Sequence, residues 1–255
     1  MDTSQLIFML GVAGWGAVVG AVVGFTAIGK GLLGTPGLIV LFGMDPVLAV
    51  GTMAVAGVAM MAAGSVTHAR EGNVEWRVAL LFSALAMPCS YLAARFAREI
   101  NDIVPLKSVI AVVIVLSVGL LFYRYVIMRA PARELDVKRV HLILAPLIGI
   151  VLGFLLGATS ISGSIIVIVF ILLLKLPSPH AVGTTSVVSA VSLAVASVAH
   201  LQQGNVDMVV LAGLLPGVLL GSIIGARYVN RVPRQALRIG ILVILLAAAV
   251  MIVVD

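Results

Sequence analysis

The chain is a succession of apolar runs, most of them long enough to cross a lipid bilayer as helices. Its residues are 62% hydrophobic and 10% charged, whereas a soluble domain has about 25% charged residues, so the surrounding solvent must be lipid. We expect an all-α polytopic membrane protein with about ten membrane segments, eight full-length and two short or broken. The segments are 5–28, 31–44, 47–69, 76–97, 104–128, 140–160, 162–175, 179–200, 206–228 and 233–254.

The basic residues lie at the ends of the apolar runs, which is the positive-inside pattern and not a nucleic-acid surface, despite the net charge of +6. If all ten segments cross, 12 Lys and Arg fall on one side and 3 on the other, with Lys30 set aside. If the two short segments do not cross, the division is 8 to 7 and gives no orientation. We therefore predict ten crossings, or short hairpins that preserve the same parity. Both termini then face outward.

One sequence pattern occurs twice. The stretch "AVGTMAVAGVAMMAAGSVTHAREGNVEW" (49–76) aligns without gaps to "AVGTTSVVSAVSLAVASVAHLQQGNVDM" (181–208), with 12 identities in 28 columns. Chance matches at Ala and Val are common in membrane helices, but a shared His-x3-Gly-Asn-Val-acid string is not. The chain therefore contains an internal duplication.

The duplication divides the chain into a first five-segment repeat (1–128), a cytoplasmic linker (129–139) and a second five-segment repeat (140–255). Since five crossings is an odd number, the second repeat must enter the membrane from the opposite side. Inverted repeats are common in secondary transporters, whose substrate site lies near the midplane between the repeats. The short or glycine-interrupted segments at matched positions indicate that site.

The interrupted segments are "GFTAIGKGLLGTPG" (24–37) and "GATSISGSIIV" (157–167). A broken helix exposes unpaired N–H groups at the start of its next segment, and an anion is their natural ligand. Lys30 either contacts that anion or extends its ammonium group to the cytoplasmic edge. The candidate substrate-binding residues here are Gly29, Lys30, Gly31, Gly34, Thr35, Ser160, Ser162, Gly163 and Ser164.

Two further groups of polar residues repeat between the halves. Thr52, Thr184 and Thr185, with the neighbouring Ser186, follow the "AVG" strings, either as N-cap and packing residues or as substrate donors. The histidines close their spans before a Gly-Asn turn, so each His–Asn pair either caps a helix end or serves coupling or gating. These coupling or gating candidates are His68, Asn73, His200 and Asn205. We expect no metal site and no cofactor, because the remaining histidines and the acids do not cluster.

Two alternatives have specific sequence features. An anion channel would use the same electrostatics without alternating access. An intramembrane hydrolase would pair His200 with Ser160, Ser162 or Ser164, but the chain has no G-x-S-x-G-type turn and the first half has a matching histidine with no serine string. We therefore expect a protein that is not an enzyme.

Taken together, the paired "AVGT…H…GNV" strings, the glycine-broken segments and "RVPRQALR" before the last span resemble the TauE/SafE sulfite-exporter family, also called toluene-sulfonate uptake permeases, over about residues 10–253. The resemblance implies a multi-pass transporter of sulfite or organosulfonates in a bacterial or archaeal inner membrane. It also implies that the segments near Gly29–Gly31 and Ser162–Ser164, with Thr52 and Thr184, form the translocation site. Unlike the usual family pattern, the second broken segment here has no proline.

The direction of transport has an energetic consequence. At about 100 mV, inside negative, one negative charge moving outward gains about 2.3 kcal/mol, so export needs no coupling ion. Import would require protons or another coupling ion, with His68 or His200 as the coupling residue. The expected partners are a small anionic substrate and the lipid bilayer, and a homo-oligomer stays open.

Overall fold

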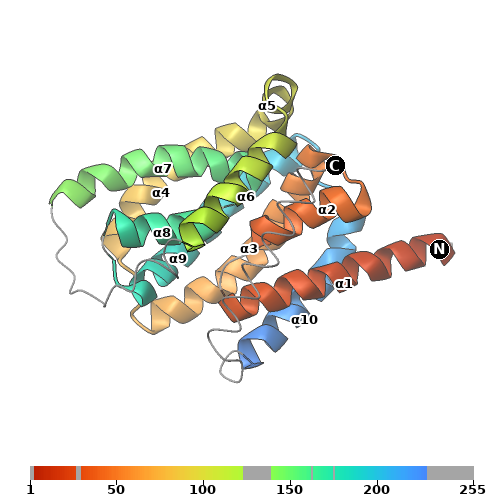
Figure 1. Ribbon diagram of the computed structural model, residues 1–255, viewed down its shortest axis with the longest axis horizontal. Coiled ribbons are helices and arrows are strands. Elements are labelled where there is room, and N and C mark those ends of the chain that lie inside the picture. Colours follow the sequence, from red (N-terminus) through yellow and green to blue (C-terminus); the bar gives the residue numbers. More distant parts are fainter. Residues whose placement is uncertain (1–2, 27–29, 123–138, 162, 175, 229–255) are drawn as a thin grey trace.

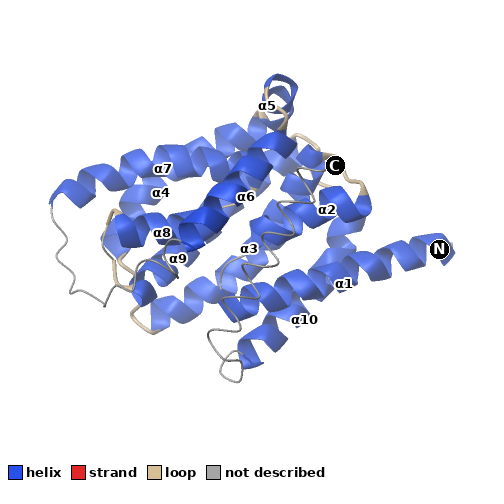
Figure 2. Ribbon diagram, in the orientation of Figure 1, coloured by secondary structure: helices blue, strands red, loops and turns tan. Residues whose placement is uncertain are grey.

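The computed structural model describes residues 3–26, 30–122, 139–161, 163–174 and 176–228. Every regular element within these ranges is a helix (Figure 2). The predicted last segment, 233–254, and the linker 129–139 up to its final residue lie outside the described residues. The all-helical architecture predicted from the sequence is confirmed for the part of the chain that is described.

The first half begins with α1 and then the interrupted segment, which is a π-helical turn continuing into a short α-helix. The elements are α1 (Thr3–Thr26), η1 (Lys30–Gly34), α2 (Thr35–Phe42), α3 (Pro46–Arg70), α4 (Trp76–Arg95), α5 (Ala97–Ile103) and α6 (Leu106–Phe122). The N-cap of α3 is Asp45, whose Oδ1 accepts hydrogen bonds from the N–H groups of Val47 and Leu48. Pro46 follows at the first helical position, where a missing N–H costs nothing.

The second half repeats this order through its first four segments. Its elements are α7 (Arg139–Thr159), α8 (Gly163–Leu172), α9 (Ser178–Gln202) and α10 (Met208–Tyr228). Asp207 precedes α10, and its Oδ1 accepts from the N–H groups of Val209 and Val210. The α9 and α10 boundaries therefore match those of α3 and α4 at an offset of 132 residues.

Five of the described helices are long and apolar enough to span a membrane, or six if the bent pair α5–α6 counts as one span. The angle within that pair is 88°. The predicted span at 140–160 appears as a shorter apolar stretch, Ile143–Thr159, and the first interrupted segment as Gly31–Phe42. A multi-pass architecture is thus supported, and the full set of ten crossings stays a prediction.

Glycine allows two pairs of helices to pack with their backbones in contact: α1 along α10, and α4 along α7 (Figure 1). In the second pair, a Cβ added at Gly149 or Gly153 would lie 2.6 Å from the carbonyl oxygen of Phe82 or Ala86, respectively. The first pair shows the same contact, since a Cβ at Gly20 would collide with the carbonyl of Val218. Such close approach is how membrane helices gain packing energy.

We call each of these two glycine-packed helix pairs, α1–α10 and α4–α7, a seam. The two seams join equivalent parts of the two halves. Helix α1 is the first helix of one half and α10 the fourth-segment helix of the other, and α7 and α4 hold the same positions with the halves interchanged. In each seam the paired residue numbers rise together, as in Gly149–Phe82 and Gly153–Ala86, so the two helices run parallel. The halves are therefore interlocked, because each supplies a helix to the other's seam.

Between the seams, α3 and α9 cross in opposite directions. Gly51, near the start of α3, packs against His200 and Asn205 at the end of α9, where an added Cβ would lie 3.2 Å from the His200 ring. Gly183, near the start of α9, packs in the same way against Asn73, after the end of α3. The contacts are reciprocal, so the matched helices of the two halves are antiparallel.

Candidate functional site

The two interrupted segments meet inside the protein. A Cβ added at Gly31 would lie 2.6 Å from the Cα of Ile161 and 2.8 Å from the carbonyl carbon of Ser160. Gly31 belongs to η1, whereas Ser160 and Ile161 link α7 to α8. Only a glycine allows this approach of two backbones, so the first break is built around the second.

The second break has a strained residue at its centre. Ser160 has φ of 58°, which makes it the one non-glycine residue with positive φ in the described ranges. Its side chain is fully buried, and its Oγ has no hydrogen-bond partner among the described residues. The neighbouring Thr159 is satisfied, because its hydroxyl donates to the Leu155 carbonyl at 2.6 Å and accepts from the Ile161 N–H at 3.2 Å. Strain and an unpaired buried hydroxyl at one residue are typical of a functional position.

The first break is closely packed by aromatic and sulfur-containing side chains. Gly34 lies against the side chain of Met53 on α3, and Gly37 lies against the indole ring of Trp15 on α1. The Trp15 indole N–H donates to the Gly34 carbonyl at 3.5 Å, a long hydrogen bond. Thr35 is fully buried, and its hydroxyl has no partner in the described part of the chain.

Several predicted site residues are only partly described. Gly29 and Ser162 lie outside the described residues, and of Lys30 and Ser164 only the backbone is described. Gly163 is the first residue of α8, as expected for a helix that restarts after a break. Among the residues predicted in the two breaks, those that the structure places in mutual contact are Gly31 and Ser160.

His200 links the end of α9 to the residue just before the second break. Its ring is fully buried, and its Nε2 lies 3.2 Å from the Gly157 carbonyl oxygen. Because a carbonyl can only accept, Nε2 carries the hydrogen. Its Nδ1 has no partner among the described residues. The imidazole therefore bridges α9 to α7 and does not cap its own helix.

Asn205 lies just after the end of α9 and interacts with a different residue. It is fully buried, and its Oδ1 accepts from the Nε–H of Arg98 at 2.7 Å. Arg98 also lines a cavity of about 360 Å³ with Asp45 and Asp102, at the end where α3 begins. Arg98 was not among the site residues predicted from the sequence.

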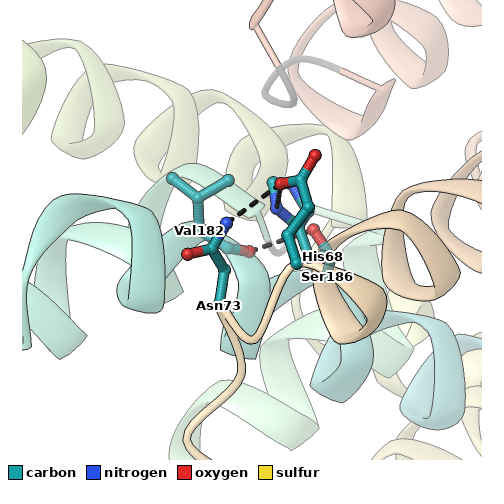
Figure 3. A network of polar contacts seen from close by, with 5 residues as sticks. His68, Asn73, Val182 and Ser186 are labelled. Atoms are coloured by element: carbon teal, nitrogen blue, oxygen red, sulfur yellow. Dashed lines mark hydrogen bonds and ion pairs between the residues drawn. The ribbon is translucent and has the colours of Figure 1, made fainter.

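His68 and Asn73, at the matched positions of the first half, have different surroundings (Figure 3). The His68 side chain is 24% exposed, and its Nδ1 lies 3.9 Å from Oε2 of Glu71. Asn73 donates from Nδ2 to the same carboxylate oxygen at 3.0 Å. Val182 and Ser186 of α9 lie beside this pair, and the Ser186 hydroxyl donates to the Val182 carbonyl.

Backbone hydrogen bonds, and not side chains, close the two His–Asn turns. The N–H of Asn73 donates to the His68 carbonyl at 2.9 Å, and that of Asn205 to the His200 carbonyl at 2.8 Å. The glycine before each asparagine has a left-handed φ, 71° in the first turn and 66° in the second. The predicted Gly-Asn turns are present, but capping by the imidazoles is wrong because the rings point to other partners. Their coupling or gating role stays a prediction.

The N-cap interpretation of Thr52 and Thr184 is wrong. The helices begin earlier, at Pro46 and Ser178, so both threonines lie inside them. Their hydroxyls instead accept from the other half's helix starts: Thr52 from the Asp207 N–H at 3.0 Å, and Thr184 from the Glu75 N–H at 2.9 Å. These contacts lie at opposite ends of the α3–α9 crossing, so the two threonines do not share one site.

Four buried hydroxyls on α9 have no partner in the described structure: that of Ser197 and three that share one face of the helix. Thr185, Ser189 and Ser192 are buried, and none of their hydroxyls has a partner there. Thr185 was predicted, whereas Ser189 and Ser192 were missed. Their spacing at i, i+4 and i+7 along one helix was the available signal. Buried hydroxyls without partners can donate to the oxygens of a small anion.

Comparison with known proteins places the chain among membrane transporters. Residues 12–252 match the family described as sulfite exporter TauE/SafE. The probable membrane transporter protein YjnA of Bacillus subtilis (strain 168) is 32% identical over 247 residues, covering 90% of this chain and 94% of the relative. The probable membrane transporter protein YdhB of the same organism is 29% identical over 227 residues, covering 87% of this chain and 90% of the relative. No solved structure matches the chain significantly.

Proposed function

The chain belongs to the sulfite exporter TauE/SafE family of membrane transporters, and on that premise we propose that it carries small sulfur-containing anions, either sulfite or organosulfonates. The proposed substrate site lies where Gly31 of the first break packs against Ser160 and Ile161 of the second. That contact is the observation on which the proposal rests, because it brings together the two segments whose backbones are interrupted.

Unsatisfied polar groups around this contact support an anionic ligand. The hydroxyls of Thr35 and Ser160 are fully buried and have no partners among the described residues. A buried hydroxyl without a hydrogen bond costs about 1–3 kcal/mol. An anion that accepts from these groups would remove that cost, and Lys30 begins η1 within the same break.

The antiparallel arrangement of matched helices supports two inverted repeats, 1–128 and 140–255. Helix α3 begins at the end of the molecule where α9 finishes, as shown by the contact of Gly51 with Asn205. If each short segment merely turned back to the membrane face from which it entered, α3 and α9 would enter the bilayer from the same side. Opposite directions instead agree with short segments that cross or preserve the parity of crossing.

The charge distribution orients this arrangement in a bacterial or archaeal inner membrane. Positive-inside counting puts the linker at 129–139 in the cytoplasm and both termini outside. The end of the molecule with Arg98 and Asn205 then faces outward, and the end with His68 and Glu71 faces the cytoplasm. Under a potential of about 100 mV this orientation makes anion export favourable without a coupling ion. Import would need protons or another ion.

Flux in proteoliposomes tests the proposal. We expect vesicles that contain the protein to release sulfite or an organosulfonate faster when their interior is made negative. Empty vesicles are the control. Flux that does not differ from empty vesicles for every sulfur-containing anion tested would contradict the proposal. Single-channel currents far above carrier rates would favour the anion-channel alternative.

Lys30 provides a second test of the site. We expect Lys30→Ala to weaken anion affinity and Lys30→Arg to retain part of it, because arginine keeps the charge. The half-saturating anion concentration of the flux distinguishes these outcomes. Normal affinity in Lys30→Ala would show that the ammonium group serves orientation at the cytoplasmic edge and does not contact the substrate.

A further inference from the structure

One face of α9 carries three buried hydroxyls in succession. Thr185, Ser189 and Ser192 are 3%, 0% and 0% exposed, respectively. Their spacing of i, i+4 and i+7 places them on one side of the helix, over about 10 Å of its length. None of the three hydroxyls has a hydrogen-bond partner in the described residues.

This lack of partners differs from the usual behaviour of hydroxyls in helices. Serine and threonine inside a helix can donate to the carbonyl of the preceding turn. Ser65, Ser186 and Thr159 do so here, each to the carbonyl four residues earlier, at 2.7, 3.0 and 2.6 Å. The three α9 hydroxyls are thus directed away from the bond that their own helix offers.

The backbone of Ser192 is linked through Ser90 to α7, the helix that leads into the second break. The Ser192 carbonyl accepts from the Ser90 hydroxyl of α4 at 3.1 Å. The Ser90 backbone packs directly against Gly157 of α7, and the Gly157 carbonyl accepts from His200. Ser160, with its own unpaired hydroxyl, follows Gly157 by one helical turn. Two separate contacts from α9 therefore converge on the residue that precedes the break.

The matched face of α3 has no hydroxyls. At an offset of 132 residues, Thr185, Ser189 and Ser192 correspond to Met53, Gly57 and Met60. Met53 fills the space beside Gly34 of the first break. The first break is therefore contacted by a thioether at a position where the second half has a hydroxyl group, Thr185.

We propose that Ser189 and Ser192, together with Thr185 and Ser160, form an oxyanion subsite confined to the second half. The inference rests on the proposed function and adds the donors that recognise the substrate. The hydroxyls of Ser189 and Ser192, about one helical turn apart, can donate to two oxygens of one sulfite or sulfonate group, whereas a halide offers a single acceptor atom.

The test is sulfite flux through Ser189→Ala and Ser192→Ala, with Ser65→Ala as the matched control because its hydroxyl is satisfied by its own helix. Loss of a hydrogen bond to a charged ligand weakens affinity about tenfold to a hundredfold. We expect the half-saturating sulfite concentration to rise by at least about tenfold in the two α9 variants. Ser65→Ala should stay close to the wild type.

Thermal stability without substrate separates recognition from a structural role. Removing a buried hydroxyl that lacks a partner should leave the melting temperature unchanged or raise it. Unchanged half-saturation in both variants, with a wild type that carries sulfite, would overturn the subsite alone. If the Ser189 and Ser192 variants lost both transport and melting temperature, the subsite would also be overturned, because the two serines would then serve packing. A wild type that carries no sulfur-containing anion would overturn the proposed function itself.

Discussion

His68 and His200 begin the same turn in the two halves, five residues before Asn73 and Asn205. Both turns have the same backbone hydrogen bonds and a left-handed glycine at the same place. Their side chains differ. The His200 ring is fully buried on the Gly157 carbonyl, whereas the His68 side chain is 24% exposed beside an exposed glutamate.

The comparison separates what the duplication retains from what it allows to change. Contacts made by backbone atoms recur in both halves, as the packing of Gly51 and Gly183 on the opposite asparagine carbonyls shows. The contacts of the histidine and asparagine side chains differ between the halves, because Asn205 is buried on Arg98 and His200 on the Gly157 carbonyl, whereas the reciprocal threonine contacts recur in both. Symmetric substitutions should therefore change stability equally at the glycines and threonines and unequally at the histidines and asparagines.

The largest effects are expected from Gly51→Ala and Gly183→Ala. In each case the new Cβ would collide with an asparagine carbonyl of the other half. Backbone cannot move aside as a flexible side chain can, so we expect each variant to lose about 3 kcal/mol of unfolding free energy. Thermal unfolding in detergent measures it. Gly119→Ala is the control, because an added Cβ there meets nothing within 4 Å. If only one of the two glycine variants lost stability, the two glycine contacts would not be equivalent.

The next effect should be unequal. His200→Ala removes a buried ring and leaves the Gly157 carbonyl without its donor, which should cost about 2–4 kcal/mol. His68→Ala should cost less, because the half-buried His68 ring holds no carbonyl of another helix among the described residues and lies beside the exposed Glu71. The two melting curves test the difference directly. Equal losses would show that the side-chain environments are not distinct.

A smaller asymmetry is expected at the asparagines. Asn205→Ala removes the acceptor of Arg98 in a buried position, and hydrogen bonds to charged groups contribute about 1.5–3 kcal/mol. Asn73→Ala loses only an exposed bond to Glu71 and should change stability by about 0.5 kcal/mol at most. Chemical unfolding of the pair gives both values. An Asn73 variant as unstable as the Asn205 variant would contradict the expectation.

The losses of stability at the two matched threonines should again be equal. Thr52→Val and Thr184→Val each remove the oxygen that accepts from a backbone N–H of the other half, at Asp207 and Glu75. Each loss should cost about 1 kcal/mol, the usual contribution of one such hydrogen bond. A difference between the two variants well above about 0.5 kcal/mol would show that the reciprocal contacts are not equivalent.

Much of the fold followed from patterns that survive in a single sequence. Apolar runs bounded by charges predicted the helices, and the His-x3-Gly-Asn-Val string at 68–74 and 200–206 predicted the duplication and its turns. The helix starts at Asp45 and Pro46 were also legible, since Asp before Pro is an N-cap signal. The N-cap of α3 is therefore Asp45 and not Thr52, which lies inside the helix. The meeting of the two breaks was expected from their matched positions.

The rest depends on contacts that a local pattern does not contain. Ser65 and Ser192 are both serines within apolar helices, but Ser65 bonds to its own helix and the Ser192 hydroxyl has no partner in the described structure. His68 and His200 lie in the same sequence motif and differ because of what surrounds them, the Gly157 carbonyl in one case and Glu71 in the other. The tertiary arrangement supplies the Gly157 carbonyl, which is 43 residues away in sequence, whereas Glu71 is three residues from His68.

The central claim, that the two halves lie inverted in the membrane with equivalent parts on opposite faces, is tested most directly by labelling cysteines at Glu71 and Gln203. These matched residues are exposed at the ends of α3 and α9, and replacing Cys89 by serine removes the one native thiol. With a membrane-impermeant maleimide on intact cells, Gln203→Cys should be labelled at once and Glu71→Cys only after the membrane is opened. Labelling of both from the same side would contradict the account.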